Sequence, residues 1–324
     1  MRVPPMCGQE STPKGCPAQT PCVAWRIPAL ASTLSRMPVR ALLLVLGAAV
    51  VHAAWNALAK RAGDQLVFLW SSVSLATLVL FPAGMRYLPA GGLPVAALPY
   101  LAATIAVHAV YFYALSRAYG SGDFSLVYPI ARGLGVALVP VLALVLLDEP
   151  LSPLGSLGVL LVVLGIVAIN LRRPAPADPA RRTRRLGAGT GWALLTGLSI
   201  CAYSVVDKAG VARLHPVPYI AIMGLGMSLL LAPAVWARRR ALAEEWRAHW
   251  PAILAASTMN LTSYLLVLFA FTLSKAGYVV AARELSIVFS VVIGRVWLGE
   301  AQLGSRLAGA AVILLGVACV ALAR

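Results

Sequence analysis

The sequence predicts an all-α membrane protein in which ten transmembrane helices form two inverted five-helix repeats. The first observation is composition, because 60% of the residues are hydrophobic and 12% are charged, whereas soluble domains carry about 25% charged residues. The second is that the apolar residues form runs near twenty residues long, and a helix needs about 20 residues to cross a bilayer. The third is a set of landmarks that recurs later in the chain.

These landmarks place the second half of the chain in register with the first. Five residue types recur 151 positions apart: Pro82 and Pro233, Arg132 and Arg283, Glu149 and Glu300, Gly158 and Gly309, and Gly165 and Gly316. Each copy contains five apolar segments, so the first copy ends on the opposite side of the bilayer from where it begins. The second copy must then be inverted, as in many secondary transporters.

The apolar runs and the loops between them define the domains in order. Residues 1–36 are rich in Pro, Ser, Thr and Cys and predict a disordered tail. Met37, which precedes a long apolar run, is the alternative start, and the tail would then be an artefact of start-site choice. The first repeat, 41–171, has predicted spans at 41–59, 66–84, 94–117, 124–147 and 154–171. Residues 172–190 form a basic linker. The second repeat, 191–323, has predicted spans at 191–210, 217–237, 251–273, 278–298 and 303–322.

The charge and the cysteines exclude several classes of protein. The net charge is +16, but most Arg residues lie in loops, where positive charge orients membrane proteins. Nucleic-acid binding would need a soluble basic face, so we expect none. The spacing of the cysteines matches neither a zinc site nor a disulfide framework. Metal-ligand clusters, nucleophile motifs and phosphate loops are also missing from the sequence, so we expect no catalytic residues, no metal and no cofactor.

Two arginines are the strongest candidates for a binding site. Arg132 and Arg283 occupy matching places in the fourth and ninth spans, and an Arg at mid-helix costs about 2.5–3.5 kcal/mol on insertion scales. Two such residues related by internal symmetry would converge near the centre, where they could hold an anionic group. Alternatively, each extends to the membrane interface or pairs with backbone carbonyls at a bent helix start. Tyr128, followed by Pro129, makes such a break plausible.

Other polar residues share faces of the first span. His52, Asn56 and Lys60 lie four residues apart, and Trp55 is nearby. His52 could take part in proton coupling, or it could hydrogen-bond to a neighbouring helix. We expect Lys60, and Lys208 at the end of the sixth span, to anchor their helices.

The third and eighth spans each carry a short polar stripe. Thr104 and His108 lie four residues apart, as do Asn260 and Tyr264. With Tyr111 and Trp55 they could line a cavity with aromatic walls. Hydrogen bonding between helices is the alternative explanation.

The remaining candidates are acidic residues and glycines. We expect Glu149 and Glu300, at the ends of the fourth spans of the two copies, to be exposed or paired with a loop Arg; a gating role is the alternative. Glu284 could neutralise Arg132 or Arg283 across a helix interface. Two glycine pairs spaced seven residues apart favour close packing inside each half, or a homodimer: Gly158 with Gly165, and Gly309 with Gly316.

The duplicated segment ends resemble the EamA family of the drug/metabolite transporter superfamily. They are Leu147-Asp148-Glu149-Pro150-Leu151 with Gly158 and Leu164-Gly165, and Leu298-Gly299-Glu300 with Gly309 and Leu315-Gly316. The stretch from Gly122 to Gly133 is also similar to a signature of one branch. The resemblance covers residues 41–323. It implies a ten-helix fold with a central cavity, and export or import of small metabolites.

One departure from the superfamily bears on mechanism. Its small multidrug members use a membrane-embedded Glu, eight residues before the Lys that ends the first span, for proton coupling. Here His52 and Ile200 take that place in the two copies. The resemblance therefore does not extend to coupling by that carboxylate.

Together, these observations predict a multi-pass protein of the inner (plasma) membrane that works as a secondary transporter. Its partners would be the lipid bilayer and a small-molecule substrate, moved by alternating access as an exporter or permease. A flippase or carrier for a lipid-linked group is the alternative, since paired arginines suit a phosphate. A scaffold or a membrane enzyme is the third hypothesis. A scaffold would not need buried arginines at duplicated sites, and no catalytic set supports an enzyme.

Overall fold

The computed structural model describes residues 37–59, 62–121, 124–171, 179–289 and 303–323. Within these ranges the chain is helical and contains no strand. The first half forms α1 (Val39–Ala59), α2 (Gln65–Met85), a 3-10 turn η1 (Val95–Ala97), α3 (Leu98–Ser121), α4 (Phe124–Leu147) and α5 (Pro153–Leu171). The second half forms α6 (Pro179–Val211), α7 (Pro216–Trp236), α8 (Arg239–Leu273), α9 (Ala276–Arg283) and α11 (Leu303–Leu322).

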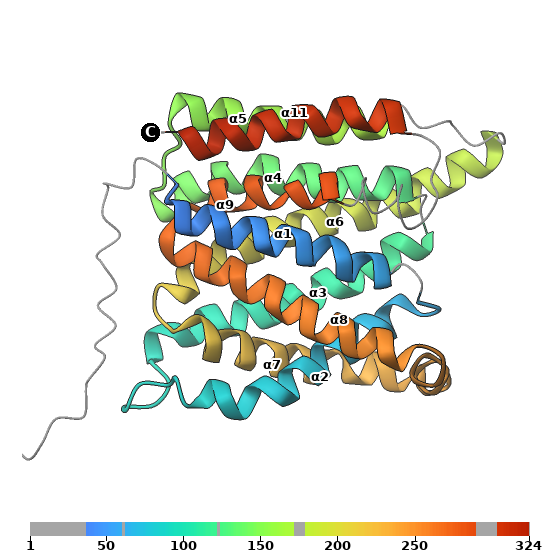
Figure 1. Cartoon of the computed structure of the whole chain (residues 1–324). Helices are drawn as coiled ribbons and strands as arrows, with labels where there is room; N and C mark the ends of the chain where they lie inside the picture. Colours follow the sequence, from blue (N-terminus) through green and yellow to red (C-terminus); the bar gives the residue numbers. More distant parts are fainter. Residues whose placement is uncertain (1–36, 60–61, 122–123, 172–178, 290–302, 324) are drawn as a thin grey trace, which may run out of the picture. The chain divides into compact units, whose positions relative to one another are not determined.

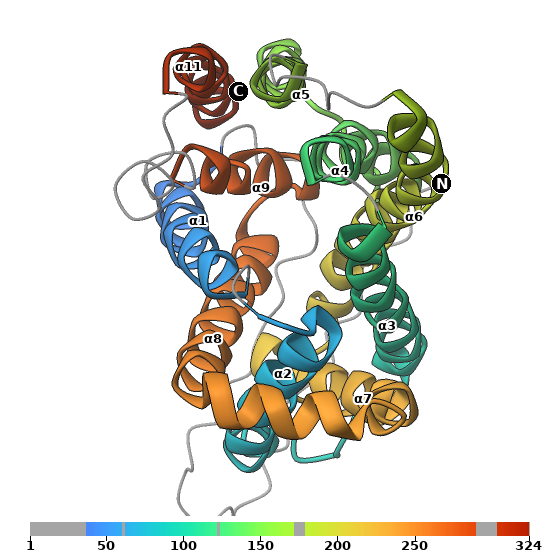
Figure 2. The same cartoon turned by 90° about the vertical axis from the view of Figure 1, so that its right-hand side faces the viewer.

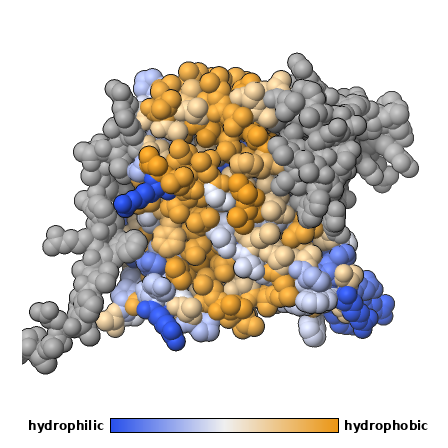
Figure 3. Space-filling model, viewed as in Figure 1, coloured by the Kyte–Doolittle hydropathy of each residue, from blue (hydrophilic) through white to orange (hydrophobic). Residues whose placement is uncertain are grey.

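Six helices in the described ranges are long and apolar enough to cross a membrane. They contain the apolar segments Val39–Asn56, Gln65–Met85, Val95–Ala118, Gly189–Val211, Pro216–Trp236 and Arg239–Leu273. Shorter apolar segments lie in α4, α5 and α11. Large apolar side chains point outward from these helices, including Leu78 at 73% exposure and Val145 at 71%. Figure 3 shows apolar residues across the middle of one face, with hydrophilic residues near its ends. This pattern is typical of a multi-pass membrane protein.

Three helices differ from the predicted spans. The polar first part of α8 begins at Arg239, and the helix kinks at His249, whose φ of −130° is non-helical. The cause is Pro251, which lacks an N–H and crowds the preceding turn. The helix α6 begins at Pro179, inside the predicted linker 172–190. The predicted ninth span, 278–298, is interrupted because α9 ends at Arg283 and helix resumes at residue 285, described to 289.

The outer pair of helices, α5 and α11, packs through the predicted glycines (Figure 1). A Cβ atom on Gly158 would lie 2.7 Å from the carbonyl oxygen of Gly316, and one on Gly165 would lie 2.8 Å from that of Gly309. Residue numbers increase along α5 in the direction in which they decrease along α11, so the two helices are antiparallel. The expectation of packing inside each half was therefore wrong, because these glycines join the two halves.

The inner helices also pair across the halves. The helix α3 packs on α6, α1 packs on α8, and α2 packs on α7. In an end-on view these six helices and the α4–α9 pair enclose the centre, while α5 and α11 lie outside (Figure 2). Contacts between α3 and α6 run from Thr104–Asp207 to His108–Tyr203, which makes this pair antiparallel as well.

Candidate transport cavity

A cavity lies among side chains from both halves of the chain. Its volume is ≈ 70 Å³, and since one water molecule needs about 10–15 Å³, it has room for a few waters or a small polar group. Most of its wall is apolar, with Met223 and Met227 from α7 and Val73 and Leu80 from α2. Its polar groups come from α1, α2, α3, α6, α8 and the end of α9. An apolar wall with a few converging polar groups is the usual composition of a small-molecule site.

Arg283 supplies the cationic group of this cavity. Its side chain is 3% exposed and lines the cavity. Its Nη2 atom donates to the hydroxyl of Tyr203 over 3.4 Å, which is a long contact, and its Nε atom has no hydrogen-bond partner within the described structure. A guanidinium has five N–H donors and no acceptor, so a ligand for this group must supply hydrogen-bond acceptors.

Arg132 is neutralised beside the cavity instead of inside it. Its Nη1 atom donates to Glu284 Oε1 over 2.9 Å, and both side chains are buried. Its Nη2 atom lies 2.6 Å from Nε2 of His52 on α1. The pair with Glu284 agrees with one of the two partners expected for that residue. The turn at Glu284, where α9 ends, places this carboxylate and Arg283 at the same break in the chain.

The contacts of His52 agree with the interhelical alternative. Arg132 can only donate to Nε2, and the Trp55 indole N–H can only donate to Nδ1, 3.2 Å away. A neutral imidazole carries one N–H, so only one of these contacts can be a hydrogen bond at a time. A protonated ring would place its charge against the Arg132 guanidinium. This geometry makes His52 a poor proton carrier.

Aromatic rings form one wall of the cavity. The ring of His108 stacks on Tyr203 at 4.4 Å and meets Tyr264 edge-on at 5.4 Å. Tyr111 meets Tyr203 edge-on at 5.4 Å. These rings come from α3, α6 and α8, so their mutual packing holds the two halves together around the site.

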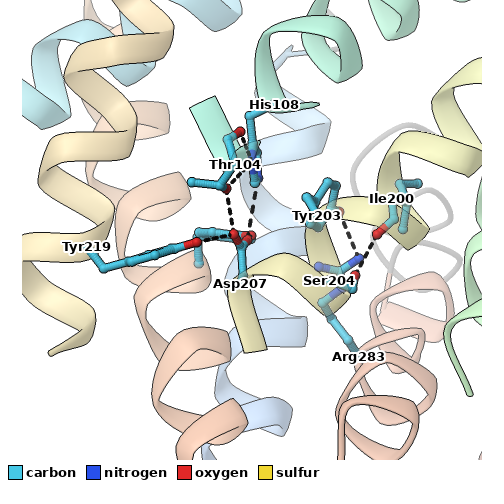
Figure 4. Close-up of polar contacts among 9 residues, drawn as sticks. Thr104, His108, Ile200, Tyr203, Ser204, Asp207, Tyr219 and Arg283 are labelled. Atoms are coloured by element: carbon cyan, nitrogen blue, oxygen red, sulfur yellow. Dashed lines mark hydrogen bonds and ion pairs between the residues drawn. The ribbon is translucent and has the colours of Figure 1, made fainter. Parts of the chain in front are cut away.

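Asp207 is the polar residue that sequence analysis missed. It lies on α6, is 0% exposed, and does not line the cavity, and its carboxylate faces His108 (Figure 4). Its Oδ1 atom accepts from Thr104 Oγ1 at 2.5 Å and from Tyr219 Oη at 2.9 Å, and its Oδ2 atom accepts from Tyr264 Oη. Asp207 next to Lys208 looks in the sequence like a solvated helix end. Its position within the apolar segment Gly189–Val211 was the available signal.

Glu149 is buried and paired, which corrects the expectation of an exposed carboxylate or a loop Arg partner. The turn after α4 resembles a Schellman cap, with Asp148 at a left-handed φ of 54° and the Glu149 N–H bonded to the Ala143 carbonyl. The side chain turns inward, where Oε1 lies 3.2 Å from Lys208 Nζ and Oε2 accepts from Ala276 N at 2.7 Å. Lys208 also donates to the last carbonyls of α8, so the pair ties four element ends together.

The predicted site residues therefore divide into three groups. Six line the cavity: His52, Trp55, His108, Asn260, Tyr264 and Arg283. Three lie behind its wall: Asn56, whose amide donates to the His52 carbonyl, Thr104, which donates to Asp207, and Arg132. The side chain of Tyr128 lies outside the described residues, as do Lys60 and Glu300. The described residues contain no group of three or more side chains that could hold a metal ion.

Comparison with known proteins identifies the family. The model of the EamA-like transporter family matches residues 187–322. A segment of 144 residues is 36% identical to the probable 4-amino-4-deoxy-L-arabinose-phosphoundecaprenol flippase subunit ArnF of Pseudomonas fluorescens, and it covers 40% of this chain and 93% of that relative. The chain belongs to the EamA family of the drug/metabolite transporter superfamily. As an EamA protein with apolar membrane-length helices, it is a membrane transporter.

The fold of this EamA protein also occurs among solved structures. One crystal structure matches with a TM-score of 0.66 over 87% of this chain and 96% of the other, at 17% sequence identity. Identity at that level extends the likeness to the fold alone.

Proposed function

We propose that this transporter moves a small molecule with an anionic group, which binds in the central cavity against Arg283. The observation that carries the proposal is a buried guanidinium that lines a largely apolar cavity and whose Nε atom has no hydrogen-bond partner within the described structure. Leaving such a charge uncompensated is costly, and an anionic ligand would offset the cost. Arg132 would position the site through Glu284, while His108, Tyr264 and Trp55 would pack against the body of the substrate.

The proposed mechanism is alternating access between two inverted repeats, 41–171 and 191–323, each with five spans. The pairing of the helices supports it, because the contacts between the halves are symmetric. The third helix of each half packs on the first helix of the other, as α3 on α6 and α8 on α1. The second helices pack on each other, as α2 on α7, and so do the last helices, α5 and α11. The EamA-like model covers 187–322, close to the second proposed repeat. The Glu149–Lys208 pair would close one end of the cavity, because it joins the ends of α4, α6 and α8 to the start of α9.

A lipid-linked group is the second candidate substrate. Here the specific observation is the 36% identity to a relative whose name describes a flippase subunit. The matched segment is 144 residues long, about the length of one proposed repeat. Each half of this chain would then correspond to one subunit of a two-subunit flippase. Arg283 would then bind a phosphate headgroup. In either case we propose the bacterial inner membrane as the location.

The test begins with metabolites compared inside and outside cells with and without this gene, followed by flux of the identified molecule into vesicles that contain the purified protein. Arg283→Gln should lower flux at least tenfold, and Arg283→Lys should recover part of it because the charge is restored. Arg213→Gln is the matched control, since Arg213 packs on Tyr100 outside the cavity. Normal flux in Arg283→Gln would remove Arg283 from the mechanism. Vesicles that instead scramble an undecaprenyl-phosphate sugar would favour the flippase.

A further inference from the structure

Asp207 is a buried carboxylate whose charge is not matched by the cations around it. Lys208 is adjacent in sequence, but its ammonium group contacts Glu149 and two backbone carbonyls. Arg132 pairs with Glu284. The side chains that contact Asp207 directly are the neutral hydroxyls of Thr104, Tyr219 and Tyr264.

The imidazole of His108 is the titratable group that faces this carboxylate most closely. Its Nε2 atom lies 3.9 Å from Asp207 Oδ2, and both side chains are buried. From α3, α6, α7, α8 and α9, the other titratable or charged side chains near the pair are Tyr111, Tyr203, Tyr219, Tyr264 and Arg283. None of the four tyrosines carries a charge near neutral pH when unperturbed, so Arg283 is the neighbouring cation.

The hydrogen bonds of His108 determine where a proton would bind. Thr104 Oγ1 uses its hydrogen for Asp207, and the Thr104 carbonyl can only accept. His108 Nδ1, 3.0 Å from both of these oxygens, must therefore carry the hydrogen. The neutral ring then has a bare Nε2 atom, and this atom faces Asp207 Oδ2 (Figure 4).

We propose that His108 and Asp207 form a proton-binding pair that couples proton movement to transport. A proton that enters from the cavity binds at His108 Nε2, where the imidazolium and the Asp207 carboxylate form a neutral pair. Loss of the proton leaves one negative charge, held by three hydroxyl hydrogen bonds. Because His108 lines the cavity and Asp207 lies behind it, the ring is the route between carboxylate and cavity.

The same geometry links the proton to the proposed anion, and this step rests on the proposed function. His108 stacks on Tyr203, whose hydroxyl accepts from Arg283. A protonated His108 repels the Arg283 cation, and an anion bound to Arg283 removes that repulsion. By linkage each ligand then favours the other. Proton and anion would therefore cross the membrane in the same direction.

The proton site can be tested without a transport substrate. Purified full-length protein in lipid nanodiscs is stepped from pH 8 to pH 5, and the protons taken up per molecule are counted. Asp207→Asn and His108→Gln should each take up about one proton fewer than the wild type. The double variant should lose the same single proton, not two. His249→Gln is the control for replacing an imidazole that contacts a carboxylate outside the cavity, and its effect should be the same in the wild type and in His108→Gln.

Other outcomes would overturn the proposal. The proposal is wrong if a folded Asp207→Asn protein takes up as many protons as the wild type. It is also wrong if sodium displaces the proton at constant ionic strength. If Asp207→Asn does not fold, Asp207→Glu should keep the proton and shift the midpoint of its uptake. Arg283→Gln should move that midpoint to higher pH because a neighbouring positive charge is lost, and an unchanged midpoint would contradict the coupling. These results are independent of whether Arg283 binds a transported anion.

Discussion

The pair of Glu149 and Lys208 gives the sharpest prediction about stability. In Glu149→Gln the amide oxygen can still accept from Ala276 N, as Oε2 does over 2.7 Å in the wild type. The change therefore removes the charge opposite Lys208 and puts an amide nitrogen, which cannot accept a hydrogen bond, in the place of Oε1. The ammonium group, 7% exposed as a side chain, is left with the carbonyls of Phe271 and Ser274.

Breaking a buried ion pair by removing one partner costs about 3–5 kcal/mol. Because Lys208 keeps two carbonyl acceptors, we expect Glu149→Gln to lower the free energy of unfolding by about 3 kcal/mol, the lower end of that range. Lys208→Met should cost at least as much, because it strands the carboxylate. The double variant removes both charges and should cost less than the two single variants together, by about 2 kcal/mol or more.

The assay is unfolding in mixed detergent micelles, followed by far-ultraviolet circular dichroism, for all four members of the cycle. Glu244→Gln is the matched control, because Glu244 is exposed on α8 and its loss should change the free energy by less than about 0.5 kcal/mol. Additive costs in the double variant, or a Glu149→Gln protein as stable as the wild type, would show that the two charges do not act as a buried pair.

Three further predictions concern the glycine contact and two helix ends. Gly158→Ala should destabilise the protein by about 1–3 kcal/mol through overpacking against the Gly316 carbonyl, whereas Gly191→Ala, with open space around it, should stabilise by up to about 1 kcal/mol in the same unfolding assay. Asp148→Gly should raise the melting temperature slightly, because Asp148 has a left-handed φ of 54° that glycine adopts without strain; a lower melting temperature would count against the described turn. Burial lowers the pKa of the His215 imidazole from its ordinary value of 6.5, and the neutral ring accepts the first N–H bond of α7. The His215 cap adds up to about 1 kcal/mol to the free energy of unfolding. This stabilisation is complete above pH 6.5 and is lost as pH falls through the folded-state pKa, because protonation removes the acceptor. In His215→Gln the stability should therefore depend less on pH in that range.

The sequence was sufficient to predict most helices because lipid requires long apolar runs. Predicted spans such as 124–147 and 303–322 match α4 and α11. The differences occur where local backbone chemistry overrides hydropathy. Pro251 allows α8 to continue into a polar segment through a kink, and the turn at Glu284 interrupts an apolar run at a point where no Gly or Pro is nearby, the nearest being Gly277 and Gly294.

The candidate site was predictable only where a residue is costly in lipid or is duplicated. Arg132 and Arg283 satisfy both conditions. In the structure Arg132 pairs with Glu284, and Arg283 directly precedes Glu284 at the turn that ends α9. Glu149 is duplicated too, but its partner Lys208 lies 59 positions away, so nothing local indicates the pair. Asp207 has no counterpart in the first copy, and its three hydroxyl donors come from three other helices. Such a cluster depends on tertiary packing.

Alternating access requires the cavity between the two halves to open in turn to each side of the membrane. This is tested by changing the five native cysteines to Ser and adding one Cys at Val73, which lines the cavity. A membrane-impermeant thiol reagent is then added to either side of sealed vesicles of known protein orientation. We expect labelling from both sides at Val73→Cys, and from neither at Leu78→Cys, which is 73% exposed on the apolar outer surface. Labelling of Val73→Cys from one side alone under every condition that supports flux would contradict alternating access.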